Sequence, residues 1–215
     1  YGVCSGSPNN ASADNNTITF DALTDGTYSD CKISVTDNAS NTSDNLSVSS
    51  FTIDTVKPVL AQVTAVTTPT KDPTPGYAFS SDEAGTISYG GCSPGGTSAS
   101  SGTNSISFGT LSDASYSCSI TVTDSAGNAS NTLTVNTFVV DATAPSISQT
   151  TAVSSYTSNN TPSYVFSSNE AGTISYGGNC SSSTTSASIG SISITFNALS
   201  EDTYSNCTIR VTDSA

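Results

Sequence analysis

The sequence predicts an all-β protein of tandem antiparallel β-sandwich domains joined end to end by short linkers. One reason is a long internal repeat, in which the segment Glu83–Gly91 recurs unchanged as Glu170–Gly178. Landmarks such as Cys31, Cys118 and Cys207 are 87 and 89 residues apart, and a period of this length corresponds to one complete small domain. The other reason is that each repeat reads as short alternating segments with turn residues between them and shows no helical periodicity.

The same alignment divides the chain into three parts. Residues 1–55 match the second half of a unit, residues 56–141 form a complete unit, and residues 142–215 form a unit without its last strand. We therefore expect the chain to be a window on a longer array of such units.

The first half of the complete unit is expected to hold three strands. They are Val59–Val66, Tyr77–Ser81 and Gly85–Gly90, with turn signals between them. Between Cys92 and Asn104 lies a stretch rich in glycine and serine, which predicts at most a weak edge strand.

The second half of the complete unit is expected to hold three more strands, Ser105–Leu111, Tyr116–Thr123 and Thr132–Val140. Their inward positions are Ile106 and Phe108 in the first, Cys118, Ile120 and Val122 in the second, and Leu133, Val135, Phe138 and Val140 in the third. The apolar alternation breaks before Phe138, which indicates a β-bulge. Together these segments predict a seven-stranded antiparallel sandwich.

The composition is that of an acidic, polar chain. Only 34% of the residues are hydrophobic, which suits thin sandwiches with one buried face per strand. With 17 acidic and 4 basic residues the net charge is −13, so nucleic acid and anionic membranes are not expected as partners. No apolar run approaches the ~20 residues of a membrane span, so membrane insertion is not expected either.

The six cysteines follow the repeat. They form the pairs Cys4 and Cys31, Cys92 and Cys118, and Cys180 and Cys207, which are 27, 26 and 27 residues apart. Six cysteines allow 15 connectivities, and the repeat favours these three pairs within units. Because no histidine and no CxxC pair accompanies them, we expect structural disulfides in an oxidising compartment and no zinc.

Further motifs lie at the linkers and turns. They are the linkers Asp54–Pro58 and Asp141–Pro145, the Thr-Pro pairs at Thr74 and Thr161, the two Glu-Ala-Gly turns, and the segments Leu23–Tyr28 and Val122–Asn128. Together these motifs resemble the bacterial Ig-like repeats of very large surface and secreted proteins. Tyr116 resembles the tyrosine corner of Ig domains, and Tyr28 and Tyr204 occupy the same place in the other units. The resemblance implies an Ig-type sandwich in an extracellular repeat architecture, although the commonest members lack this cysteine pair.

The predicted function is structural. Without histidine the chain offers no Ser-His or Cys-His pair, so an enzyme is not expected. The resemblance implies a stalk or spacer of a cell-surface or extracellular adhesin, filament or sheath, whose partners are neighbouring Ig-like repeats of the same chain and lateral copies in a filament. Two alternatives remain open: a filament subunit completed by strand exchange with a neighbour, and a carbohydrate- or protein-binding module.

Acidic residues are expected to gather where two units meet. In an Ig-type sandwich the incoming linker and two of the loops share one end of the unit. At the first joint this end holds Asp54, Asp82, Glu83 and Asp124, with Asp25 of the preceding unit opposite; at the second it holds Asp141, Glu170 and Asp213, with Asp113 opposite.

With no basic residue expected nearby, such carboxylates repel one another, and a calcium ion would relieve the repulsion. No cofactor is otherwise required. In the alternative interpretation, Asp124 and Asn128 cap a turn, Glu83 favours a tight turn, and Asp54 starts the linker turn.

Overall fold

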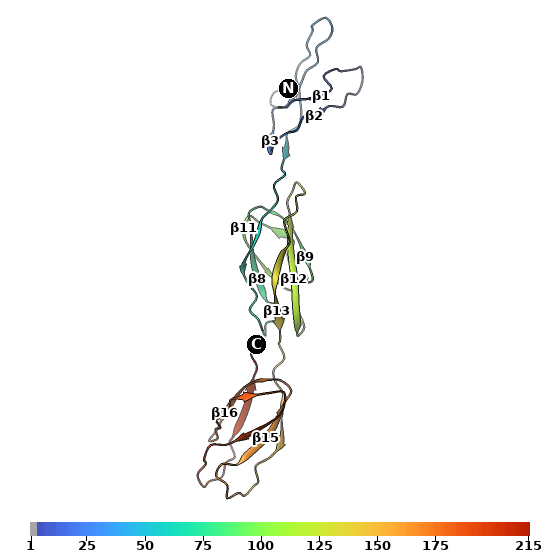
Figure 1. The fold of residues 1–215 in the computed structure, drawn as a ribbon. Coiled ribbons are helices and arrows are strands. Elements are labelled where there is room, and N and C mark those ends of the chain that lie inside the picture. Colours follow the sequence, from blue (N-terminus) through green and yellow to red (C-terminus); the bar gives the residue numbers. More distant parts are fainter. Residues whose placement is uncertain (1–3) are drawn as a thin grey trace.

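The computed structural model describes residues 4–215, which are all-β: 19 short strands in antiparallel sheets. Figure 1 shows three bodies following one another along one long axis. We call them the first unit (4–55), the middle unit (56–141) and the third unit (142–215). The exact boundaries between the three units remain those predicted from the sequence repeat. No helix long and apolar enough to cross a membrane occurs in the described part of the chain.

The middle unit is a sandwich of two sheets with the seven strands that the sequence predicts. One sheet has the order β11-β8-β7 and the other has the order β10-β9-β12-β13. The bounds are β7 Leu60–Thr64, β8 Gly76–Ser81, β9 Gly85–Gly90, β10 Ser98–Ala99, β11 Gly102–Ser107, β12 Ala114–Thr123 and β13 Leu133–Val140. The predicted weak edge strand is β10, and the predicted fold class is confirmed.

One predicted strand is displaced. The alternation of Ile106 and Phe108 predicted a strand from Ser105 to Leu111, whereas β11 runs from Gly102 to Ser107. Its first three residues are polar and carry no apolar signal, yet they pair in register with the last three residues of β8. Gly102 starts the strand from a left-handed conformation (φ +101°), which favours glycine.

The predicted bulge lies on β13. Tyr116 pairs with Phe138 and Cys118 pairs with Val135. Between these two pairs β12 has one residue and β13 has two, so β13 carries one extra residue. This extra residue keeps Val135, Phe138 and Val140 all inward, and each is only 1% exposed.

The core of the middle unit lies between the two sheets. It contains the large side chains Tyr77, Phe79, Ile120 and Val122, together with the inward residues of β13. The predicted tyrosine corner is present, because the Tyr116 hydroxyl donates to the carbonyl oxygen of Ser112 at 2.9 Å. Tyr28 and Tyr204 make the same bond to the carbonyls of Thr24 and Ser200, at 2.8 and 3.1 Å.

The third unit repeats this arrangement over its own core. Its sheets have the orders β14-β15-β18 and β17-β16-β19. The bounds are β14 Ile147–Thr151, β15 Ser163–Ser168, β16 Gly172–Gly177, β17 Ser186–Ala187, β18 Gly190–Thr195 and β19 Thr208–Thr212. The core contains Phe166, Ile174, Ile194 and Val211.

The first unit contains three two-stranded sheets, β1-β2, β3-β6 and β4-β5. The bounds are β1 Gly6–Ser7, β2 Thr19–Phe20, β3 Gly26–Tyr28, β4 Lys32–Ile33, β5 Leu46–Ser47 and β6 Phe51–Ile53. Its buried hydrophobic residues are the two cysteines Cys4 and Cys31, while Leu46 is 67% exposed.

Candidate functional site

Each unit carries one disulfide, and in the middle and third units it lies at two neighbouring strands of one sheet. The bonds are Cys4–Cys31, Cys92–Cys118 and Cys180–Cys207, with Cα atoms 5.5, 5.4 and 5.3 Å apart. These are the three pairs that the repeat predicts. In the middle unit Cys92 follows β9 and Cys118 lies within β12, the neighbour of β9 in the same sheet. The three bonds indicate an oxidising compartment.

A glycine brings the chain from β9 to its cysteine. Gly91 has φ +78°, and a Cβ atom there would clash with the carbonyl oxygen of Ser117 on β12. Gly178 repeats this in the third unit, with φ +75° and the carbonyl of Asn206 in the same place. Only glycine fits such an approach, and this explains the glycines at positions 91 and 178, shortly before Cys92 and Cys180.

At each joint, an aspartate of the preceding unit binds the linker. Asp25 accepts hydrogen bonds from the backbone N–H and the hydroxyl of Thr55, at 3.1 and 2.9 Å. Asp113 accepts from the backbone N–H of Ala142 at 2.8 Å and from the hydroxyl of Thr143. The Ala142 N–H and then the Thr143 hydroxyl hold the pKa of Asp113 below its ordinary 3.8.

At the first joint, the following unit binds the same linker from the other side. The Asn128 side-chain amide donates to the carbonyl oxygen of Asp54 at 3.0 Å and to Oδ2 of Asp124 at 2.9 Å. The two linker residues Asp54 and Thr55 are therefore held by both units.

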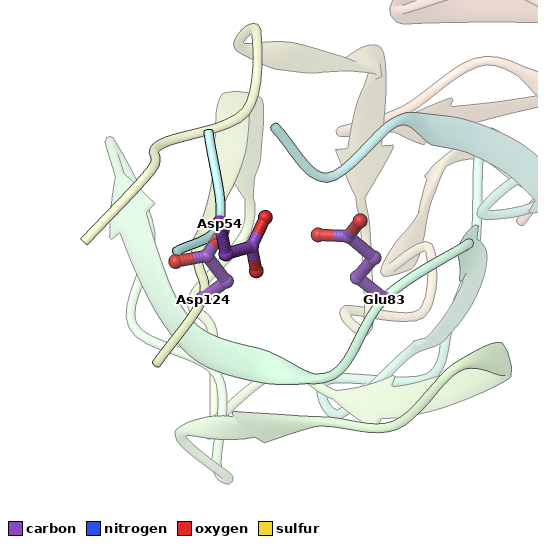
Figure 2. Close-up of side chains that lie close together, drawn as sticks. All are labelled: Asp54, Glu83 and Asp124. Carbon is purple, nitrogen blue, oxygen red and sulfur yellow. The ribbon is translucent and has the colours of Figure 1, made fainter. Parts of the chain in front are cut away.

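Three of the predicted acidic residues converge at each joint. Asp54, Glu83 and Asp124 each place a carboxylate oxygen within 4.8 Å of the other two, and Asp141, Glu170 and Asp213 do the same at the second joint. All six are half-buried. Figure 2 shows the first group, in which Asp54 and Asp124 lie side by side and the Glu83 carboxylate points toward them.

Glu83 is the electrostatically strained member of the first group. Its Oε2 atom is shielded from solvent and has no hydrogen-bond partner, and Oε2 of Glu170 is in the same situation. Burial raises the pKa of Glu83, and repulsion from Asp54, Asp82 and Asp124 raises it further. Both effects disfavour the ionised form, and a bound cation would favour it.

The other two members also stabilise local turns. Oδ1 of Asp124 accepts from the backbone N–H groups of Ala126 and Asn128, at 2.8 and 2.9 Å. Burial raises the pKa of Asp124, but the hydrogen bonds, chiefly those of Asn128, outweigh burial and leave the pKa below 3.8. Asp54 accepts from the backbone N–H of Val56 at 3.1 Å. The turn roles therefore coexist with the acidic group.

The structure corrects the predicted ligand sets in three places. Asp25 and Asp113 belong to neither carboxylate group, because they bind the linkers as described above. Asp82 is also outside, since its Oδ1 accepts from the backbone N–H of Val59 at 2.7 Å. Its counterpart in the third unit is the neutral Asn169, which accepts from Ser146 N–H at 2.6 Å, so this position needs an acceptor and no charge.

The two joints differ in their surroundings. A cleft at the second joint is lined by Asp141 and Asp213 together with the basic residues Lys71 and Arg210. The expectation that no basic residue lies near is therefore wrong for this joint. Arg210 replaces Thr121 of the middle unit, so the first joint is the better candidate for a cation.

Comparison with known proteins adds little. No family model matches the chain, and no curated protein matches it. Among solved structures, the chain is similar to the D00–D0 domain of Intimin with a TM-score of 0.37 and 11% identity, over 73% of this chain and 93% of that one. The fold assignment rests on the sheet order and strand pairing of the chain itself.

Proposed function

We propose that this chain is a non-catalytic, tension-resisting spacer of a large extracellular bacterial surface protein, of the adhesin, filament or sheath type. Its partners are neighbouring repeats of the same chain and, in a filament, lateral copies. The observation that carries the proposal is one disulfide in every unit, which in the middle and third units lies at two adjacent strands. In the middle unit such a cross-link keeps the residues between Cys92 and Cys118, which are 26 apart in sequence, from being drawn out when the chain is pulled.

The joints support the same function. Asp25, which accepts from the Thr55 N–H, and Asn128, which donates to the Asp54 carbonyl, hold the first linker from both sides. Pro58 and Pro145 restrict the backbone at the end of each linker. A spacer needs joints of this kind, because a freely hinged chain would shorten under thermal motion.

The stiffness of the joints is directly measurable. Pulsed electron paramagnetic resonance on spin labels at exposed sites of the first and middle units should give one narrow distance distribution. The Asp25→Ala/Asn128→Ala variant should broaden it, while a substitution at the exposed Ser115 on β12 should not. An equally broad distribution in the parent chain and the variant would contradict the spacer proposal.

We further propose that the first joint binds calcium through Asp54, Glu83 and Asp124. The support is the convergence of three half-buried carboxylates and the unpartnered Oε2 of Glu83. Oxygen ligands of this kind suit a hard divalent cation. A cation there would tie the linker to two loops of the middle unit and so stiffen the joint.

Calorimetry tests this second proposal. Calcium should raise the thermal midpoint of the middle unit, chelation should reverse the rise, and Glu83→Gln should abolish it. Asp82→Asn is the matched control, since Asp82 lies beside Glu83 but outside the group. If calcium moves neither the thermal midpoint nor the label distances, the three acids are turn and surface residues only.

A further inference from the structure

The aspartate that binds the first linker is followed by a glycine. We call Asp25 and its hydrogen bonds to Thr55 the first linker clamp. Asp25–Gly26 is the one Asp-Gly pair of the sequence, which has no Asn-Gly pair. At the equivalent place the middle unit has Asp113–Ala114 and the third unit has Glu201–Asp202. The three units therefore offer a matched comparison of the same turn with and without this pair.

The Asp-Gly pair lies open to solvent where the chain enters β3. Asp25 and Gly26 are both exposed, and the equivalent residues Asp113 and Ala114 of the complete middle unit are exposed as well. Gly26 has φ +152°, and no atom lies within 4 Å of the place where a Cβ atom would stand. This side of Gly26 is therefore uncrowded and accessible to water.

An aspartyl-glycyl bond in such a place can rearrange without a cofactor. The backbone nitrogen of Gly26 attacks Cγ of the protonated Asp25 carboxyl, and the new C–N bond closes a five-membered succinimide ring. The carboxyl hydroxyl leaves as water with the proton that the nitrogen loses. Water then adds to one of the two ring carbonyls and breaks its bond to the nitrogen, which gives aspartate again or isoaspartate with no net change in atoms. Glycine favours the ring, because it has no Cβ atom and its backbone reaches conformations that other residues avoid.

The hydrogen bonds of the clamp oppose this reaction in the folded chain. Oδ1 of Asp25 accepts from the N–H and the hydroxyl of Thr55, at 3.1 and 2.9 Å, and Oδ2 accepts from the same hydroxyl at 3.1 Å. Both carboxyl oxygens are therefore engaged. Because ring closure expels one of them, at least one of these bonds must break for the ring to form.

We propose that Asp25–Gly26 is a site of spontaneous isoaspartate formation, which releases the first linker clamp as the protein ages. Isoaspartate continues the main chain through Cγ, so the backbone gains one carbon atom before Gly26 and the free carboxylate moves to Cα. Gly26 pairs with Ile53 of β6, so the insertion displaces the carboxylate relative to the linker that follows β6. The inference goes beyond the spacer function, because the reaction is a chemical property of one turn and is measured without tension.

Oxygen-18 labelling tests the chemistry. The oxidised 215-residue chain is kept at neutral pH and physiological temperature in oxygen-18 water and then mapped by peptide mass spectrometry. An isoaspartyl-specific methyltransferase detects the product. The peptide that contains Asp25 should take up the label and become a methyl acceptor, whereas the peptide that contains Asp113 should do neither.

Variants of the pair locate the reaction. Gly26→Ala should slow label uptake by about tenfold or more, because a Cβ atom crowds the nitrogen and restricts the backbone. Asp25→Glu keeps the carboxylate but cannot close the five-membered ring, and it should abolish label uptake at this position. No label at residue 25 of the parent chain, or equal uptake by the parent chain and the Asp25→Glu variant, would overturn the proposal.

The backbone amide of Thr55 reports on the clamp. In nuclear magnetic resonance its hydrogen exchange should be faster in the isomerised chain than in the fresh chain, while the amide of Ala142, which Asp113 binds, should be unchanged. Thr55→Val removes the hydroxyl donor and should speed isoaspartate formation about threefold or more, since fewer hydrogen bonds oppose ring closure. Unchanged exchange of Thr55 after isomerisation, or equal rates in the parent chain and the Thr55→Val variant, would refute the release of the clamp.

Discussion

Reduction of the disulfides should change how far each unit extends under force. In the oxidised middle unit, pulling can draw out only the residues outside the loop between Cys92 and Cys118. After reduction the residues between the cysteines are released as well. The first and third units have loops of nearly the same length, so all should respond alike.

The size of the change follows from the loop. The cysteines are 26 residues apart in sequence and their Cα atoms are 5.4 Å apart. At ~3.6 Å per extended residue, the released segment adds about 90 Å to the contour length of each unit. The same loop length predicts that reduction lowers the free energy of unfolding by roughly 3.5 kcal/mol per unit in the chain-entropy treatment.

Single-molecule pulling measures this length directly. Force–extension traces of the chain should show unfolding steps about 90 Å longer with reductant than without it. A Cys92→Ala/Cys118→Ala variant should show the longer step for the middle unit in both conditions and so assigns that step. Equal step lengths with and without reductant would refute the claim that the disulfides limit extension.

Two further predictions concern the core and the second joint. Phe138→Ala should lower the unfolding free energy of the middle unit by about 3–5 kcal/mol in chemical denaturation, because it removes a fully buried ring. Thr137→Ala, at the exposed neighbouring position, is the control. A loss below ~1 kcal/mol for Phe138→Ala would contradict the packing described. The stabilising contribution of Asp113 should be present above its ordinary pKa of 3.8 and be lost as the pH falls through the lower pKa that its hydrogen bonds give it in the folded protein. The distribution of spin-label distances between the middle and third units should therefore broaden in acid. In the Asp113→Ala variant this distribution should already be broad at neutral pH. If the variant and the parent chain gave the same distribution at both pH values, the role of Asp113 would be contradicted.

Much of the fold could be predicted because its signals are local. Alternation along a strand marks one buried face, so most strands of the middle unit and the bulge on β13 could be read from the sequence. The tyrosine corner could be read from the resemblance to Ig domains. The disulfide pairs could be read from the repeat. The start of β11 could not, because Gly102, Thr103 and Asn104 are polar and their pairing depends on β8.

The joints were predicted less well because their contacts cross between units. Asn128 donates to the carbonyl oxygen of Asp54, 74 residues away in sequence, and no local sequence pattern predicts such a bond. A usable signal did exist for the linker clamps, since Asp25 precedes Thr55 and Asp113 precedes Thr143 by the same 30 residues. The basic residues at the second joint could not be placed without the fold, because Lys71 and Arg210 come from different units.

Small-angle X-ray scattering tests the central claim, an extended rod of disulfide-locked sandwiches, most directly. Units of about 35–45 Å each, set by a ten-residue strand plus its loops, predict a rod with a radius of gyration of about 30 Å. A compact globule of this chain length would give about 17 Å. A value near 30 Å with a rod-like distance distribution is the predicted result, and a value near 17 Å would contradict the account.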